Sequence, residues 1–362
     1  MSPTNTLNPA APGFKISDPS AGRRATAKIV RIHELGGPEV LRIEDLPLMD
    51  PKAGEVRIKV QAIGLNRAEV MFRTGQYLEQ PEFPSRIGVE AAGIVDAVGS
   101  GVHNVRIGDK VSVATGQSIG HYGTYGESAI VPAASAIPYP DNLSPEEAAS
   151  VWVQYLTAYF AFVDLAGLKS GQFVLVTAAT GGAGLGAIEI ARLLGAITIA
   201  TTRSASKKQA LLDVGADHVI VTQDEDLVAR VKQITGGKGA DLIFDPVAGD
   251  TLPTLAEAVA WGGQIILYGA LGGTNTSYPL WTGFARNFTL RTYMVYNFCG
   301  LPNLGLPRNE EAFSRAVQFI NASLRKGKLK PIIAKTFPLS ELREAHRYME
   351  SNQQLGKIVV TV

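Results

Sequence analysis

A run of glycines joins two apolar segments in residues 174–196, which read VLVTAATGGAGLGAIEIARLLGA. The run Val174–Val176 is typical of a buried strand, and Leu185–Leu194 is typical of a helix of apolar and small residues. At such a strand-to-helix junction, backbone amides can approach a pyrophosphate at the positive end of the helix. The alternative is a tight turn that binds no ligand, so the neighbouring elements must decide between the two.

The spacing of this loop departs from the G-x-G-x-x-G pattern, because its register reads Ala179-x-Gly181-x-x-Gly184. Ala179 can form the tight turn if its φ is negative, and Gly181 permits close approach of a phosphate. Gly184 permits close packing of the helix on the sheet. Together with Gly182 and Ala183, these residues form the candidate phosphate site.

The residues after the next apolar strand indicate which nicotinamide cofactor the loop would serve. An acidic residue about 20 positions after the loop usually binds the ribose hydroxyls of NAD, but no Asp or Glu lies between Glu189 and Asp213. Arg203, Ser204 and Lys207 lie there instead and can donate hydrogen bonds to a 2′-phosphate. The alternative is that the two cations only decorate a helix start, where the helix dipole disfavours them. We therefore predict NADPH.

An alternation of strands and helices surrounds the glycine loop. Apolar strands are predicted at residues 174–177, 197–202, 218–222, 241–245 and 264–269. With helical segments between them, they predict a doubly wound parallel sheet of the Rossmann type, whose strands are buried on both faces. The glycine loop is the first strand-to-helix loop of this sheet, which favours the phosphate site over the plain turn.

Shorter strands separated by Gly, Pro and Asp precede this sheet, at residues 27–32, 55–64, 91–99, 109–113 and 127–132. They predict a β-rich, barrel-like domain, and residues 146–166 predict one or two helices after it. From Phe288 onwards the chain returns to mixed strands and a helix and ends in GKIVVTV, and we expect this segment to pack on the N-terminal domain. A ligand should then bind in the cleft between the two domains.

The composition fits a two-domain protein: 362 residues, 46% of them hydrophobic and 19% charged, with a formal net charge of +1. This near-neutral charge argues against nucleic acid or an acidic membrane as partner. No apolar run reaches the length of about 18 residues that a membrane span needs. The single cysteine, Cys299, excludes an internal disulfide and a cysteine-rich zinc lobe.

Residues 1–24 are rich in Pro, Ser, Thr and Asn and lack the apolar core of a secretory signal. They predict a flexible extension on a cytoplasmic protein. A cryptic transit peptide is the alternative.

Five motifs together carry a resemblance to a known family: GLNRAEVMFRTGQY (64–77), RIGVEAAGIVDAVGSGV (86–102), GDKV (108–111), AATGGAG (178–184) and GKIVV (356–360). From about residue 25 onwards the chain resembles the medium-chain dehydrogenase/reductases, and within them the zinc-free quinone oxidoreductase branch that includes zeta-crystallin. The resemblance implies an α/β protein with a flexible extension at 1–25, a GroES-like catalytic domain at 26–150, an NADP-binding Rossmann domain at 151–289 and a C-terminal segment at 290–362 that returns to the catalytic domain. It also implies homodimers joined through the edges of their parallel sheets.

The zinc ligands of the alcohol dehydrogenase branch are missing at the matching positions. Val89 stands where that branch has histidine, Asn66 stands near its cysteine, and residues 116–127 hold none of four clustered cysteines, so that His121 alone cannot build a site. Without a Lewis acid, alcohol oxidation is difficult, whereas a quinone or an α,β-unsaturated carbonyl accepts hydride directly. The predicted activity is therefore zinc-independent, NADPH-dependent reduction of such a small electrophilic acceptor.

The resemblance places Asn66 beside the nicotinamide and the acceptor, as an orienting residue or hydrogen-bond donor; the alternative is a turn asparagine that holds its own backbone. Tyr77 is implied as a donor to the acceptor oxygen, or as a residue that only lines the pocket. Thr157 matches a threonine that faces the nicotinamide side, unless its hydroxyl only bonds to the preceding helical turn. Tyr122 and Tyr125 are two further candidates for reaching the cleft.

The resemblance also implies cofactor contacts at three later places. The segment Tyr268-Gly269-Ala270 is expected close to the nicotinamide ribose, although small residues there also suit an ordinary turn. Thr222 and Asn352 fall where relatives place a tyrosine and an arginine near the 2′-phosphate. Both departures weaken the phosphate pocket, and Arg203 is expected to replace the lost charge.

Three other residues are interpreted as structural: Asp245, Glu90 with Arg86 as its basic partner, and Cys299 as a packed small residue. Two rival functions stay open. One is an enoyl reductase that acts on a CoA- or carrier-linked acyl chain, and the other is a low-turnover NADPH-binding protein like the crystallin relatives. Saturable reduction of a defined acceptor would distinguish the predicted quinone or enone reductase from a low-turnover binding protein.

Overall fold

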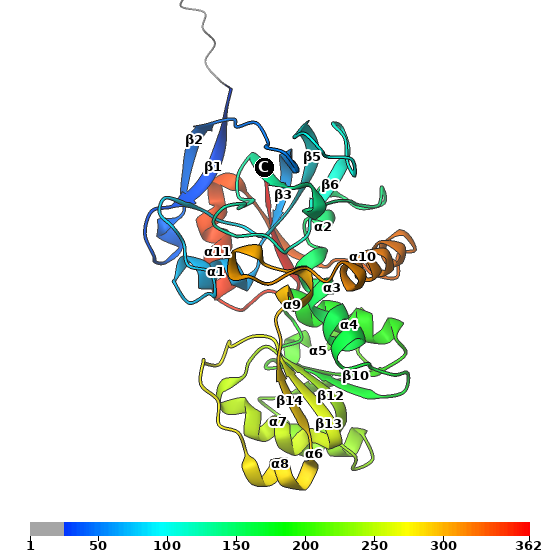
Figure 1. Cartoon of the computed structure of the whole chain (residues 1–362). Coiled ribbons are helices and arrows are strands. Elements are labelled where there is room, and N and C mark those ends of the chain that lie inside the picture. Colours follow the sequence, from blue (N-terminus) through cyan, green and yellow to red (C-terminus); the bar gives the residue numbers. More distant parts are fainter. Residues whose placement is uncertain (1–24) are drawn as a thin grey trace, which may run out of the picture.

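The computed structural model describes residues 25–362, which form two lobes (Figure 1). The first lobe, drawn in blue and cyan together with the red end of the chain, is built around antiparallel strands. The second lobe, drawn in green and yellow, contains a parallel sheet. The predicted extension at residues 1–24 lies outside the described residues.

The main sheet of the first lobe has seven strands, in the order β15-β16-β3-β5-β6-β8 with β7 paired to β3. Their bounds are β3 Glu55–Gly64, β5 Glu90–Val98, β6 Lys110–Val113, β7 Ser128–Pro132, β8 Ala136–Pro138, β15 Ile333–Pro338 and β16 Lys357–Thr361. A smaller sheet, in the order β2-β1-β4, comprises β1 Thr26–Ile32, β2 Arg42–Pro47 and β4 Ser85–Arg86. The helices of this lobe are α1 Arg67–Arg73 and α11 Leu342–Glu350.

Strand β3 shows why this sequence forms such a sheet. Val56, Ile58 and Val60 are buried, while Arg57 and Lys59 between them remain accessible. This period of two places one row of apolar side chains in the core and the other row at the surface. The predicted β-rich domain is therefore confirmed.

The second lobe contains a six-stranded parallel sheet in the order β11-β10-β9-β12-β13-β14. Its strands are β9 Phe173–Val176, β10 Ile197–Thr202, β11 His218–Val221, β12 Ala240–Asp245, β13 Val259–Leu267 and β14 Thr289–Thr292, and its helices are α4 Gly182–Leu193, α5 Lys208–Val214, α6 Leu227–Ile234, α7 Leu252–Ala258 and α8 Leu280–Arg286. Val174 and Val176 pack in one hydrophobic cluster and Leu175 in another, so both faces of the sheet are buried. The predicted doubly wound sheet is confirmed.

The chain returns to the first lobe after β14. It passes through α9 Tyr296–Cys299 and α10 Glu310–Arg325, and then forms β15, α11 and β16. Strand β16 pairs with β3, with Val359 opposite Gly64. The expectation that GKIVVTV packs on the N-terminal domain is confirmed.

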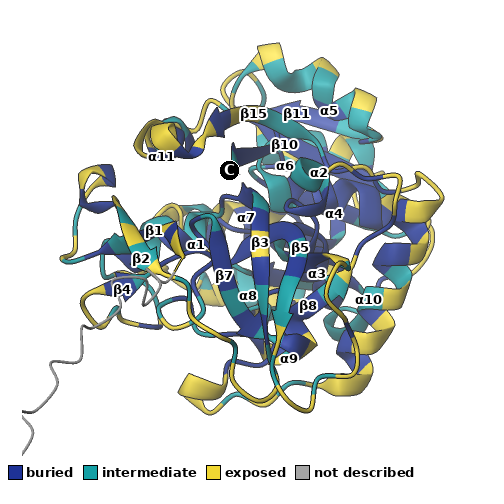
Figure 2. Cartoon of the chain, turned by 90° about the horizontal axis from the view of Figure 1, so that it is seen from above, coloured by how far each residue is buried: buried dark blue, intermediate teal, exposed yellow. Residues whose placement is uncertain are grey.

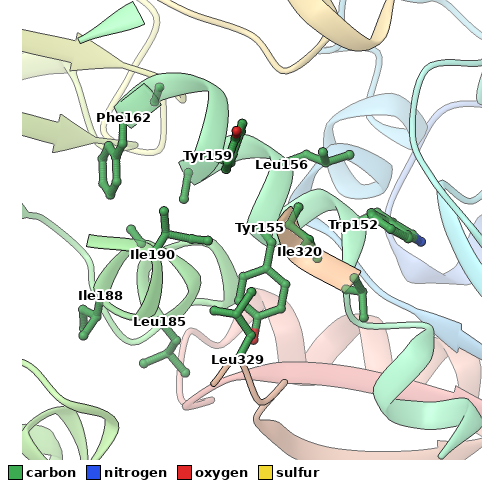
Figure 3. Close-up of a cluster of buried hydrophobic side chains, with 14 of the residues drawn as sticks. Trp152, Tyr155, Leu156, Tyr159, Phe162, Leu185, Ile188, Ile190, Ile320 and Leu329 are labelled. Carbon is green, nitrogen blue, oxygen red and sulfur yellow. The ribbon is translucent and has the colours of Figure 1, made fainter. Parts of the chain in front are cut away.

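Helices α2 Pro145–Ala148 and α3 Trp152–Tyr159 connect the lobes, and a π-helical turn at Phe160–Leu165 follows them. Tyr155 and Leu156 of α3 pack against Leu185 of α4 and Ile320 of α10 in one buried cluster (Figure 3). Burial continues from the sheets of both lobes into α4, where most residues are dark blue (Figure 2). No helix among residues 25–362 is long and apolar enough to cross a membrane.

One charged side chain lies inside this junction. Glu189 of α4 is 6% exposed, and its carboxylate accepts hydrogen bonds from the Tyr155 hydroxyl at 2.8 Å and the Lys330 amide at 3.0 Å. Burial raises the pKa of Glu189 to about 7, because the two donors only partly replace the lost water. The folded protein therefore holds this carboxyl protonated where the unfolded chain has lost the proton.

We expect Glu189 to make the protein less stable as pH rises from 4.5 towards 7, with its contribution lost above that range. The shift corresponds to roughly 3 kcal/mol between pH 5 and pH 8. Glu189→Gln, which keeps the shape of the protonated group, should flatten this dependence. Unfolding free energies of both proteins at the two pH values would measure it; equal changes in the two proteins would contradict it.

Candidate functional site

The glycine loop lies between β9 and α4, and the helix begins at Gly182, three residues earlier than predicted. Gly181 caps the helix in an extended conformation, with φ of −76° and ψ of 163°. Ala178 has a positive φ of 46°, whereas Ala179 does not, as the tight turn requires. The Ala179 amide donates to Thr201 at 3.1 Å, which fixes the loop to the neighbouring strand β10.

Three glycines of the loop have different surroundings. A Cβ atom on Gly184 would lie 2.6 Å from Ala179 Cα, so this glycine allows the close approach of helix and loop. A Cβ on Gly182 would lie 2.8 Å from Lys357 Cδ. A Cβ on Gly181 would have only Ala178 O within 4 Å, at 3.8 Å. The direction in which a Gly181 side chain would project is therefore unobstructed, while the Gly181 amide donates to Ala178 O at 3.3 Å.

Lys357 carries a buried ammonium beside this loop. Its Nζ donates to Glu90 Oε2 at 2.8 Å, Asn66 Oδ1 at 2.7 Å and Leu65 O at 3.0 Å, and the side chain is 4% exposed. The predicted pairing of Glu90 with Arg86 is wrong. Arg86 instead donates to the carbonyl oxygens of Gly123 and Ser128. We call Lys357, Glu90, Asn66 and Glu69 the lysine network.

Asn66 is fully engaged within the lysine network. Its Nδ2 donates to Gly64 O at 3.2 Å and to Glu90 Oε2 at 3.0 Å, while its backbone amide donates to Glu69 Oε2 at 2.6 Å. The bond to Gly64 is the backbone-holding alternative considered for this residue. Asn66 also stands directly before α1, so its position is fixed by both a helix start and a buried ion pair.

Glu69 is the member of the network that sequence reasoning missed, together with Lys357. It is fully buried and accepts from the backbone amides of Val89, at 3.1 Å, and Asn66. Burial raises the pKa of Glu69 to about 8, although the charge of Lys357 acts in the opposite direction. The sequence does hold a signal for both residues, because each lies inside one of the five motifs. Glu69 is three residues after Asn66 in the first motif, and Lys357 directly follows Gly356 in the last.

Two tyrosine hydroxyls meet between the first lobe and α9. Tyr77 donates to Tyr296 Oη at 3.1 Å. Burial and the neighbouring Tyr296 raise the pKa of Tyr77 well above its ordinary value, and burial raises the pKa of Tyr296 to about 12. Both hydroxyls are therefore protonated donors at neutral pH. Tyr296 was not identified from the sequence, since it carries no motif.

Thr157 lies on α3, and its hydroxyl donates to Val153 O at 2.5 Å, which is the bond to the preceding helical turn. The Val153 amide donates in turn to Glu90 Oε1 at 2.7 Å, so α3 is tied to the lysine network. Tyr125 is fully buried in the core of the first lobe, with its hydroxyl 3.2 Å from His346 Nε2. The expectation that Tyr125 reaches the cleft is therefore wrong. Tyr122 donates to Glu55 at the start of β3, the end remote from Gly64.

The predicted 2′-phosphate residues lie at the ends of β10 and β11. Arg203 is exposed. The pKa of Lys207 is lowered mainly by burial and, to a smaller extent, by the positive charge of Arg203. The Ser204 hydroxyl accepts from the Ser206 amide at 3.3 Å. Thr222 donates from its hydroxyl to Thr202 O at 3.3 Å.

Asn352 lies beside these residues, across the junction of the lobes. Lys207 Nζ donates to the backbone oxygens of Asn352 and Gln354 at 3.3 and 3.2 Å. The structure thus brings Lys207 and Asn352 together, although 145 positions separate them in the sequence.

Tyr268, Gly269 and Ala270 follow the end of β13, at the edge of the sheet where the glycine loop follows β9. The Tyr268 ring stacks on Phe244, with centroids 3.9 Å apart. A Cβ on Gly269 would lie 2.7 Å from Pro246 O, so this position requires glycine for packing. Asp245 is fully buried and accepts from the amides of Val247 and Ala248, as a structural carboxylate does.

Within residues 25–362, no three side chains of His, Cys, Asp or Glu are grouped so that they could hold a metal ion. Glu90, next to Val89, is already bound to the Lys357 ammonium. The arrangement instead offers a helix N-terminus, a buried ammonium, two protonated tyrosines and surface cations.

Comparison with known proteins identifies the family. The alcohol dehydrogenase GroES-like domain matches residues 52–141, and the zinc-binding dehydrogenase domain matches residues 182–321. The chain is 30% identical over 335 residues to the quinone oxidoreductase of Rattus norvegicus, covering 92% of this chain and 97% of that protein. The chain belongs to the quinone oxidoreductase family. The resemblance stated from the five motifs is confirmed, as is the combination of GroES-like and Rossmann folds.

Two further proteins are similar to this chain over most of its length. The chain is 31% identical over 342 residues to the synaptic vesicle membrane protein VAT-1 homolog of Rattus norvegicus, covering 90% of this chain and 81% of that protein. The structure of Escherichia coli quinone oxidoreductase complexed with NADPH superposes with a TM-score of 0.83 at 31% identity, covering 93% of this chain and all of the other. This quinone oxidoreductase family member is an oxidoreductase of the medium-chain dehydrogenase/reductase superfamily.

Two glycine variants should separate ligand approach from packing in this family member. Gly181→Ala leaves the unliganded fold intact, because its Cβ would enter open space, but it should raise the Kd for NADPH at least roughly tenfold, or about 1.4 kcal/mol. Gly184→Ala should lower the stability of the unliganded protein by about 1–3 kcal/mol through overpacking. Thermal unfolding and equilibrium cofactor titration would measure both effects. Unchanged NADPH binding by Gly181→Ala would show that the phosphates lie elsewhere.

Proposed function

We propose that this protein transfers hydride from NADPH to a quinone or an α,β-unsaturated carbonyl, without zinc. The observation that carries the proposal is the unobstructed glycine at the N-terminus of α4, Gly181, which lies beside the lysine network that holds Asn66. A pyrophosphate at this N-terminus would be stabilised by backbone amides and the helix dipole. The nicotinamide would then extend towards Asn66 and the tyrosine pair.

The preference for NADPH is supported by the charges at the other end of the site. Arg203 and Lys207 lie near each other at the end of β10, where an acidic residue would repel a 2′-phosphate. The Escherichia coli relative was solved in complex with NADPH. We propose that Arg203, Ser204 and Lys207 bind the 2′-phosphate, with Thr222 and Asn352 at its border.

The bound cofactor would supply the hydride, and the protein must supply a donor for the oxygen that becomes negative. Tyr77 and Tyr296 are suited to this task, because each carries a neutral hydroxyl that can donate a hydrogen bond to the developing oxyanion, and burial raises the pKa of both further. We propose Tyr77 as the donor: its single hydroxyl hydrogen, directed at Tyr296 Oη without a ligand, would turn to the acceptor oxygen, with Tyr296 as its partner. Asn66 acts as an orienting residue, since its amide hydrogens are already bound to Gly64 and Glu90.

We propose that Thr157, Tyr268, Gly269 and Ala270 border the nicotinamide and its ribose. Thr157 already donates to Val153, so its remaining role is to accept a hydrogen bond or to shape the wall. Zinc independence rests on the side chains at the matching positions. Val89 has no ligand atom, and the Asn66 amide oxygen is bound to the Lys357 ammonium.

An assay of reduced-nicotinamide oxidation tests this function. The purified protein would be given NADPH or NADH with 9,10-phenanthrenequinone, 1,4-benzoquinone or a 2-alkenal, before and after treatment with a chelator. We expect saturable oxidation that prefers NADPH by at least roughly tenfold, or about 1.4 kcal/mol, and that the chelator leaves unchanged. Loss of activity on chelation would contradict zinc independence.

Other outcomes would redirect the proposal. Tight NADPH binding with no oxidation by any of the three acceptors would contradict a general quinone or enone reductase. It would favour either an enoyl reductase for a CoA- or carrier-linked acyl chain or a low-turnover binding protein. A trial with crotonyl-CoA then separates these two, since only the reductase consumes NADPH.

We also propose a homodimer formed through the second lobe. Strand β14 is an edge strand, paired with β13 alone among the described strands. Helix α8 just before it has no buried residue, and Trp281 and Phe284 on it are 83% and 68% exposed. Exposed aromatic side chains beside an unpaired strand edge are typical of a surface that a second copy covers.

Trp281→Glu combined with Phe284→Glu should convert the dimer to a monomer, because each copy would bury charges at the contact. The matched control is Ile107→Glu, which adds a charge at a 63% exposed apolar residue of the first lobe. Sedimentation velocity would give the masses. A monomeric wild-type protein, or a dimer that survives the double substitution, would refute the interface.

A further inference from the structure

Two cationic side chains from opposite lobes contact the turn that follows α11, and a third lies near one of them. Arg67, the first residue of α1, approaches this turn from the first lobe, where α1 lies beside α11 (Figure 1). Lys207 approaches it from the second lobe. Arg203 lies close enough to Lys207 for its charge to lower the pKa of that ammonium. We call these three residues the cation cluster.

The contacts of Arg67 leave much of its guanidinium free. Its Nη2 donates to Met349 O at 3.0 Å and to Asn352 Oδ1 at 2.5 Å. No partner is recorded for Nε or Nη1 among residues 25–362. Asn352, whose backbone oxygen accepts from Lys207 at 3.3 Å, therefore stands between two cations from opposite lobes. Its left-handed conformation, with φ of 58°, directs the side chain and the carbonyl to different partners.

The cation cluster has no anionic partner within the described part of the chain. None of its members forms an ion pair there, unlike Arg57, Arg73 and Arg315. Burial alone lowers the pKa of Arg67, and burial and Arg203 lower that of Lys207. Partly buried like charges without a counterion raise the free energy of a protein, and a dianion placed among them would lower it.

We propose that Arg67 is a specificity-determining residue that completes the 2′-phosphate pocket from the first lobe. Its Nη2 binds the same turn as Lys207, and a planar guanidinium can bind two phosphate oxygens at once. Arg67 is the first residue of α1 and directly follows Asn66. A phosphate bound by Arg67 and by the second lobe would therefore also hold the start of α1, and with it Asn66, in position. This proposal rests on the proposed NADPH preference, and it assigns part of that preference to the catalytic lobe.

Binding of cofactor fragments tests this role without any acceptor. Calorimetric titration with 2′,5′-ADP and with 5′-AMP compares ligands that differ only by the 2′-phosphate. For Arg67→Met we expect the Kd of 2′,5′-ADP and of NADPH to rise roughly tenfold, while those of 5′-AMP and NADH change by less than about twofold. Arg67→Lys keeps the charge but loses the planar guanidinium with its paired donors. Its Kd for 2′,5′-ADP should lie between those of the wild-type protein and Arg67→Met. Arg203→Ala serves as the positive comparison.

The control variant is Arg343→Met, because Arg343 also donates to a backbone oxygen, that of Leu41, and forms no ion pair within residues 25–362. It should leave all four Kd values unchanged. Equal weakening of 2′,5′-ADP and 5′-AMP by Arg67→Met would show that Arg67 only holds the turn, and an unchanged Kd for 2′,5′-ADP would place the phosphate elsewhere. Either result overturns the proposal.

The same data separate this proposal from the proposed function. If Arg67→Met shows the selective loss while the wild-type protein reduces no acceptor, the phosphate pocket stands and the reductase does not. If the wild-type protein binds 2′,5′-ADP no better than 5′-AMP, both the NADPH preference and the role of Arg67 fail.

Discussion

The buried ammonium of Lys357 is the interaction on which the wall of the candidate site depends. It joins β16, the start of β5 and the residues before α1, which are far apart in the sequence. Lys357 and Glu90 are 4% and 1% exposed, so removing either would leave an uncompensated charge, at a cost of about 3–5 kcal/mol. Such a pair tolerates little variation in geometry, since each polar atom has its partner already assigned.

The glycine loop is built onto this constraint. The Lys357 side chain passes so close to Gly182 that no Cβ fits between them, and the Val153 amide of α3 binds the second oxygen of Glu90. A ligand at the helix N-terminus would therefore lie beside Lys357 and Glu90, whose side chains cannot move independently of each other. The two ends of the candidate site differ in chemistry: protonated hydroxyls lie at Tyr77 and Tyr296, and cations without counterions lie at the other end.

Features that depend on local pattern could be predicted from the sequence. Most strands of both sheets and the phosphate loop follow from apolar periodicity and from glycine at a strand-to-helix junction, whereas the short strands β8 and β14 were not predicted. The start of α4 was placed three residues late, because glycines in its first turn disguise a helix that is stabilised by packing against Ala179.

Features that depend on distant pairing could not be predicted. Glu90 was assigned to Arg86, four positions away, but its partner Lys357 is 267 positions away. Tyr125 was expected in the cleft because glycines surround it, yet its ring fills the core and its hydroxyl meets His346. The roles of Tyr296 and Arg67 likewise depend on segments that only the tertiary fold brings together. A single sequence carries no signal for such contacts.

The pairing of β16 with β3 also determines the order in which the molecule can be completed. The parallel sheet of the second lobe is formed by one continuous stretch, from β9 to β14, in which only the pairing of β9 with β12 passes over other strands. The first sheet can be completed only by residues 333–361, because Val359 lies opposite Gly64 across almost three hundred positions. Closing so long a loop is slow, and during synthesis residues Ala62–Gly64 of β3 lack their partner strand until β16 has been made. The nucleotide-binding half can thus be folded while the catalytic half remains a substrate for chaperones.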